Sequence, residues 1–319
     1  MRLATIDQLK GLAIIGVVCY HLNDWRLAID TGWLMMFIGW CVFAFLFAAG
    51  VLHGLKFTAK PTGEFIRQRT QRLLIPFLLI GTLMCTLRQV MEATGAIELR
   101  LRYPSTLGGK LLGHVLLETP MVAYPLYFFI LLLVVSVLFK LLQASGLKEK
   151  QLPWLAVATL VLTVLAWRAT DLLPVTGFGV QMVLLGLFQY ACGHLMSRGS
   201  TPQECPVVWV LVGVLLLLSA VTQVPNFVLV AMPPLLFYVL GRAAQHGWKL
   251  QPLVFLGERS GTIFAYHVPF ITGSLLVIFH KLGVPDALNL LLTLISTLAI
   301  CSGIHYVLHR WTVFKWFRV

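Results

Sequence analysis

The chain has 319 residues, of which 59% are hydrophobic and only 11% are charged, and its formal net charge is +12. A soluble domain carries about 25% charged residues, so this composition excludes an ordinary soluble protein and indicates several membrane-spanning helices. The Lys and Arg residues are scattered between apolar segments, which is the pattern of the positive-inside rule and gives no indication of a nucleic-acid partner.

The apolar segments predict an all-α, polytopic membrane protein whose single integral-membrane domain covers residues 1–319. About ten membrane-spanning helices are expected, separated by short polar or basic segments, and the mixed-polarity segment 93–119 is either a loop or a short interfacial helix. With the N-terminus inside, 17 of the 24 Lys and Arg residues fall on the cytoplasmic side. An even number of spans then places both termini in the cytoplasm. The ten predicted spans are 8–22, 33–53, 73–92, 120–143, 152–167, 176–196, 206–223, 227–241, 260–280 and 287–308.

The first span carries ionisable groups at both ends. Lys10 and His21 are eleven positions apart, so they share nearly the same helical face and lie roughly 16 Å apart along the axis. Asp24 follows one turn after His21 and could orient the imidazole, and a neutral, oriented imidazole suits a general base. The alternative is a histidine that is hydrogen-bonded at the outer interface and has no catalytic role.

A basic segment precedes the third span. Arg69 and Arg72 stand at positions i and i+3, on one helical face at the predicted cytoplasmic entry. Two guanidinium groups in this arrangement could bind a phosphate in bidentate fashion, and Lys10 would join them if the spans pack together. Ordinary anchoring by the positive-inside rule explains each arginine equally well by itself.

The segment 255–270 reads F-L-G-E-R-S-G-T-I-F-A-Y-H-V-P-F. We expect Gly257 to end one helix and His267 to lie in the next helix, just before Pro269. His267 is then either a second functional histidine or a histidine that faces the bundle at a proline-distorted turn. No metal-binding signature is present, and the six cysteines lack CxxC spacing, so no metal site is expected.

Four short motifs, in matching order, resemble the membrane-bound acyltransferase 3 family. The family's first helix typically reads "DGLRG" followed by an apolar run and "YH", which Asp7-Gln8-Leu9-Lys10-Gly11 and Tyr20-His21 match, with Lys10 where the family usually has Arg. The family's RxxR motif matches Arg69 to Arg72, and its small-residue packing motif matches Phe45 to Gly50. Its fourth segment is similar to Phe255-Leu256-Gly257 and Tyr266-His267-Val268-Pro269.

The resemblance implies transfer of an acyl group, usually acetyl, from cytoplasmic acyl-CoA to a hydroxyl of a sugar or cell-envelope glycan. We therefore expect a multi-pass protein of the bacterial inner membrane. By this hypothesis, Lys10, Arg69 and Arg72 hold the phosphates of acyl-CoA. His21, oriented by Asp24, deprotonates the acceptor or takes the acyl group itself, and Asp7 and His267 are further candidates.

Two other classes of function remain open from the residues alone. A transporter or membrane sensor would use buried His and Arg groups without acyl transfer. A scaffold within an envelope-assembly complex would tolerate substitution of His21 or Arg69. No internal repeat of the kind found in many transporters is visible in the sequence.

Overall fold

The computed structural model describes residues 2–23, 40–94, 105–117, 124–168, 179–197, 205–222 and 226–311. Within these ranges the chain forms helices and no strands, which confirms the predicted all-α class. Asp24 lies outside the described residues. The α-helices are α1 (Arg2–Asn23), α3 (Cys41–Lys56), α4 (Thr62–Ala93), α5 (Leu107–Val115), α6 (Tyr127–Ala144), α7 (Leu152–Arg168), α8 (Val180–Met196), α9 (Pro206–Thr222), α10 (Asn226–Gln245), α11 (Gln251–Tyr266), α12 (Thr272–Lys281) and α13 (Asp286–Arg310).

Among the described residues, five helical segments are long and apolar enough to cross a membrane, and they belong to α4, α6, α7, α10 and α13. Shorter apolar helices, α3, α8 and α9, accompany them. Ten spans with both termini in the cytoplasm therefore stay a prediction. The helix α5 matches the short helix that was one of the two expectations for segment 93–119.

The predicted span 260–280 is divided in the structure. The helix α11 ends at Tyr266, a π-helical segment η4 covers His267–Ile271, and α12 begins at Thr272. Within η4, Val268 has extended backbone angles (φ −120°, ψ 148°), so the chain changes direction immediately after His267. The second half of the predicted span thus starts a separate helix.

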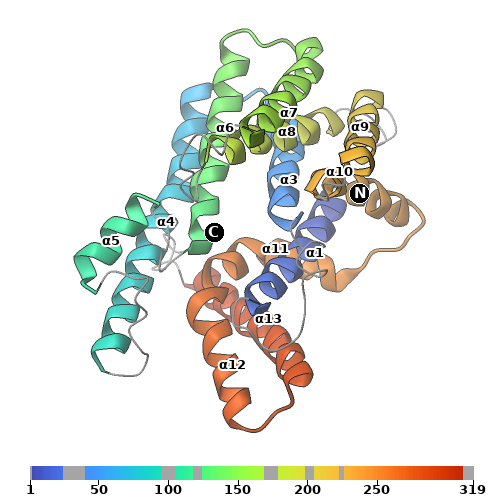
Figure 1. The fold of residues 1–319 in the computed structure, drawn as a ribbon. Helices are drawn as coiled ribbons and strands as arrows, with labels where there is room; N and C mark the ends of the chain where they lie inside the picture. Colours follow the sequence, from blue (N-terminus) through green and yellow to red (C-terminus); the bar gives the residue numbers. More distant parts are fainter. Residues whose placement is uncertain are drawn as a thin grey trace.

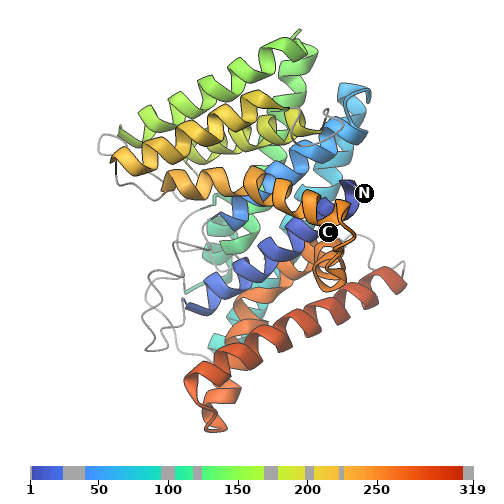
Figure 2. The ribbon, with the colours of Figure 1, turned by 90° about the vertical axis from the view of Figure 1, so that its right-hand side faces the viewer.

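The helix α1 lies inside the bundle and packs most extensively against α11, with α3, α10 and α13 as further neighbours (Figures 1 and 2). Two glycines permit this contact: Gly11 meets the backbone of Leu253, and Gly257 meets the backbone of Asp7. A Cβ atom at either glycine would collide with the facing helix. The prediction that Gly257 ends a helix is therefore wrong, because its missing side chain serves close packing inside α11.

A second close pair, α3 and α8, stands beside α1 (Figure 1). Gly50 meets the backbone of Tyr190, and Gly193 meets that of Phe47. The small-residue run 45–50 therefore acts as a packing motif, as the sequence indicates. These two tight pairs fix α1, α3 and α11 around the candidate site.

Candidate active site

A cavity of about 380 Å³ opens where α1, α3, α4, α6 and α11 meet. We call it the cationic cavity, because Lys10, Lys56, Arg69 and Arg72 line it. Three of these residues are the predicted phosphate-binding set, so the structure brings Lys10 together with the two arginines of α4. Lys56, the last residue of α3, was not in that set, although it belongs to the same basic stretch of sequence as Arg69.

Each acidic residue that lines the cationic cavity forms an ion pair with a Lys or Arg side chain. Lys10 Nζ lies 2.7 Å from Asp7 Oδ1, one turn away on α1, and Glu258 pairs with Arg259 at 3.3 Å. Asp7 is therefore placed at the cavity as the partner of Lys10. Lys56, Arg69 and Arg72 then supply the excess positive charge of the described lining, which suits an anion such as a phosphate.

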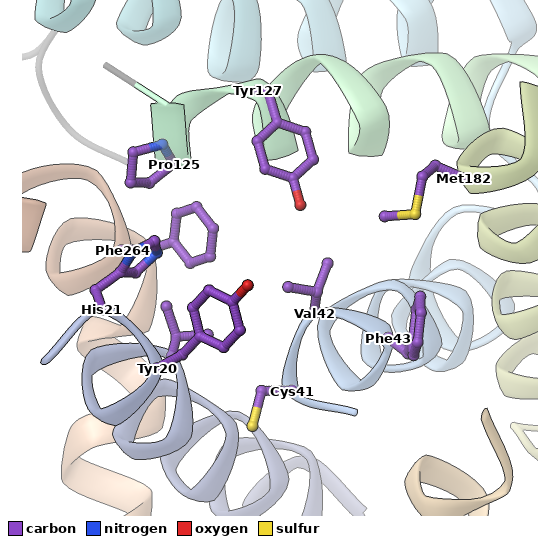
Figure 3. Close-up of a pocket in the computed structure, with 10 residues that line it drawn as sticks. Tyr20, His21, Cys41, Val42, Phe43, Pro125, Tyr127, Met182 and Phe264 are labelled. Atoms are coloured by element: carbon purple, nitrogen blue, oxygen red, sulfur yellow. The ribbon is translucent and has the colours of Figure 1, made fainter. Parts of the chain in front are cut away.

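His21 borders a second cavity, of about 200 Å³, which we call the histidine cavity. Its described lining is mostly apolar and includes Val17, Val42, Phe43 and Met182. Figure 3 shows the hydroxyl groups of Tyr20 and Tyr127 directed toward the middle of this cavity, with the His21 ring at its edge. The described walls therefore combine an apolar surface with two hydroxyl groups and one imidazole.

The ring of Phe264 lines both cavities and lies 6.1 Å, between ring centroids, from that of His267. It packs against Phe128 at 5.0 Å and against Phe45 at 5.9 Å between ring centroids. Phe45 and Phe128 also line the cationic cavity. This aromatic cluster therefore lies between the cations of the cationic cavity and His21, the candidate base.

His267 lies beside His21, with ring centroids 5.2 Å apart. It is fully buried, and its Nδ1 lies 2.9 Å from the carbonyl oxygen of Ile263 and 3.0 Å from that of Phe264. Because carbonyl oxygens only accept hydrogen bonds, Nδ1 carries a proton, and neutral His267 has its lone pair on Nε2. Nε2 has no hydrogen-bond partner among the described residues.

The sequence alone could not predict that His267 lies beside His21, because the contact depends on how α1 packs against α11. The role predicted for Asp24 falls outside the described residues. In the described part of the chain, no group of three or more His, Cys, Asp or Glu residues is arranged to hold a metal ion.

A family model described as an acyltransferase domain matches residues 3–306, which is nearly the whole chain. The chain belongs to the acyltransferase 3 family. Membership in the acyltransferase 3 family supports membrane acyltransferase activity, in agreement with the apolar helices. Comparisons with curated proteins and with solved structures gave no match.

Proposed function

We propose that this acyltransferase moves an acyl group, in the first instance acetyl, from cytoplasmic acyl-CoA to a hydroxyl of a sugar or cell-envelope glycan. The observation that carries the proposal is the pairing of two cavities across Phe264, one with an excess of cations and one bordered by His21. Acyl-CoA has the matching design, since its phosphates and its thioester stand at opposite ends of a long arm.

In this proposal, Lys10, Arg69 and Arg72 bind the phosphates of acyl-CoA. Arginine side chains present planar forks that match phosphate oxygens, and lysine adds a point charge. The pantetheine arm then follows α1 toward His21. Lys10 and His21 stand on one unbroken helix, roughly 16 Å apart along its axis, which is similar to the length of that arm.

At the other end, His21 is the proposed base. It takes the proton of the acceptor hydroxyl while that oxygen attacks the thioester carbonyl carbon. The tetrahedral intermediate collapses with loss of the CoA thiolate, which takes the proton from the imidazolium. The alternative route, in which His21 first accepts the acyl group and CoA leaves before the acceptor enters, would give ping-pong kinetics.

The proposed setting is the bacterial inner membrane, with both termini and the cationic cavity on the cytoplasmic side, where acyl-CoA is made. The distribution of Lys and Arg along the chain supports this orientation. The proposed acceptor is a glycan of the cell envelope, and the hydroxyl groups of Tyr20 and Tyr127 could guide it by hydrogen bonding.

Two measurements test the function. Mass spectrometry of envelope glycans, from cells with and without the protein, should show acyl groups that are absent when the protein is absent. Purified protein in liposomes, supplied with acetyl-CoA and these glycans, should release free CoA. Identical glycan profiles together with no release of CoA would reject acyl transfer and would favour a transporter, a sensor or a scaffold.

A further inference from the structure

A chain of hydrogen-bonded polar side chains from α3, α6 and α8 lies next to Arg69. We propose that Tyr190, His53 and Gln143 are positioning residues that hold Arg69 for binding of the donor phosphates. This inference rests on the proposed function, and it adds three residues that neither the predicted site nor the lining of the two cavities contains.

The chain begins at Tyr190 of α8. Its hydroxyl lies 2.9 Å from His53 Nδ1, and the Arg69 guanidinium is close enough to interact with the same hydroxyl. His53 Nε2 lies 3.0 Å from Gln143 Oε1 on α6. Tyr190 and His53 are both fully buried, so the contact between them is shielded from water.

The donors and acceptors allow one consistent direction along the chain. Gln143 Oε1 can only accept, so His53 Nε2 carries the hydrogen and Nδ1 accepts from the Tyr190 hydroxyl. The Tyr190 oxygen then turns its lone pairs toward Arg69, whose guanidinium can only donate. The chain thus presents an acceptor to Arg69 on the protein side.

Aromatic rings restrict Arg69 further. Its Cζ lies 5.2 Å from the centre of the Phe57 ring and 5.3 Å from that of Phe65, both within the range of cation–π attraction. The His53 ring packs against Phe65 with centroids 5.1 Å apart, so the polar chain and the rings form one cluster. Arg69 is held from behind by this cluster while it lines the cationic cavity.

Burial of polar groups is costly unless each one is paired, so a histidine at this position is not explained by packing alone. An arginine fixed before the ligand arrives loses less side-chain entropy on binding than a free one. Preorganised Arg69 should therefore bind coenzyme A more tightly than an arginine on a flexible side chain. This gain in affinity is the effect that we expect from the hydrogen-bonded side chains.

A double-mutant cycle tests the proposal, with coenzyme A titrated into purified protein in lipid nanodiscs. Tyr190→Phe keeps the ring and removes the oxygen that faces Arg69. We expect it to raise the Kd for coenzyme A about three- to tenfold. In an Arg69→Ala background, which itself weakens binding, the same change should have no further effect. Tyr238→Phe on α10, whose ring packs against Trp209, is the matched control and should bind like the wild type.

Each outcome decides the matter. An unchanged Kd in Tyr190→Phe, or an equal loss with and without Arg69, would overturn the positioning role. If Arg69→Ala itself leaves the Kd unchanged, the donor site of the proposed function fails as well. Should Tyr190→Phe fold poorly, Gln143→Leu at the outer end of the chain gives a second measurement, because it should raise the Kd only when Arg69 is present.

Discussion

The imidazole of His21 on α1 lies 5.2 Å, between ring centroids, from that of His267, at the junction of α11 and η4. The two residues come from opposite ends of the sequence, and the contact of α1 with α11 brings them together. His267 is anchored through Nδ1 to two carbonyl oxygens of its own helix. Its Nε2 is buried and has no hydrogen-bond partner among the described residues.

The first prediction distinguishes the role of Nδ1 of His267 from that of its Nε2. The side-chain amide of His267→Asn can still donate to the carbonyl oxygens of α11, but it has no atom at the position of Nε2. We expect acyl transfer to fall at least tenfold in kcat, with the KM for acyl-CoA unchanged, if Nε2 assists the reaction.

The comparison is His267→Phe, which loses both nitrogens but keeps an aromatic ring. It should be no more active than His267→Asn. Wild-type turnover in His267→Asn would show that the histidine serves only to anchor the kink, and would remove it from the reaction.

The second prediction concerns the arginines of the cationic cavity. Hydrogen bonds to charged groups contribute about 1.5–3 kcal/mol, so Arg69→Ala and Arg72→Ala should each raise the KM for acyl-CoA roughly 10- to 100-fold. The KM for the acceptor should change little. Steady-state kinetics with both substrates varied would measure the two constants.

Arg67→Ala is the matched control for these variants. Arg67 belongs to the same basic turn of α4, but it is exposed and does not line the cationic cavity. It should leave the KM for acyl-CoA unchanged. An equal effect from all three arginines would indicate a general loss of positive charge, and would argue against a specific phosphate clamp.

Much of the candidate site was predictable, because it depends on the geometry of single helices. The shared face of Lys10 and His21 follows from 3.6 residues per turn. The spacing of Arg69 and Arg72 follows from the same geometry. Their meeting with Lys10 required the helices to pack side by side, and in the structure all three residues line one cavity.

The contacts that the sequence did not reveal are those between helices distant in the chain. The shared wall at Phe264, the pairing of His21 with His267, and the contact of His53 with Tyr190 each join different helices. Gly257 illustrates the difficulty, since a glycine in a sequence signals a helix end and a close helix contact equally. The facing backbone of Asp7 decides between them, and it is far away in the sequence.

The third prediction concerns that contact. Gly257→Ala places a methyl group against the backbone of Asp7, which cannot yield as a side chain could. Overpacking of this kind costs about 1–3 kcal/mol, so the midpoint of thermal unfolding should fall, and transfer activity should fall because α1 carries both Lys10 and His21.

Gly303→Ala in α13 adds the same methyl group where no heavy atom lies within 4 Å. It should unfold at the wild-type temperature or above it, since alanine favours a helix over glycine. Equal unfolding midpoints for the two variants would show that the contact between α1 and α11 is looser than described.

The fourth prediction concerns a buried ion-pair cluster between α4 and α5. Glu92 lies 2.7 Å from Lys110 Nζ and 2.6 Å from Arg88 Nε, and the side chains of Glu92 and Lys110 are at most 2% exposed. Removal of one member from a buried pair leaves an uncompensated charge, so Glu92→Gln should destabilise the protein by about 3–5 kcal/mol.

Lys110→Met should cost less than Glu92→Gln, because Glu92 would keep Arg88 as its partner. Thermal unfolding of both variants in the same detergent gives the comparison. A larger loss in Lys110→Met would mean that Arg88 does not compensate Glu92.

The most direct test of the account is transfer of labelled acetyl groups from acetyl-CoA by membranes that contain the wild type or His21→Ala at equal amounts. General acid–base catalysis contributes about 100- to 10,000-fold. Loss of the smaller of these factors would leave about 1% of the wild-type rate, so we expect His21→Ala to transfer label at that rate or more slowly. The purified variant should still bind coenzyme A with the wild-type Kd, because the cationic cavity is intact. Full transfer activity in His21→Ala would contradict the central claim that His21 performs the chemistry.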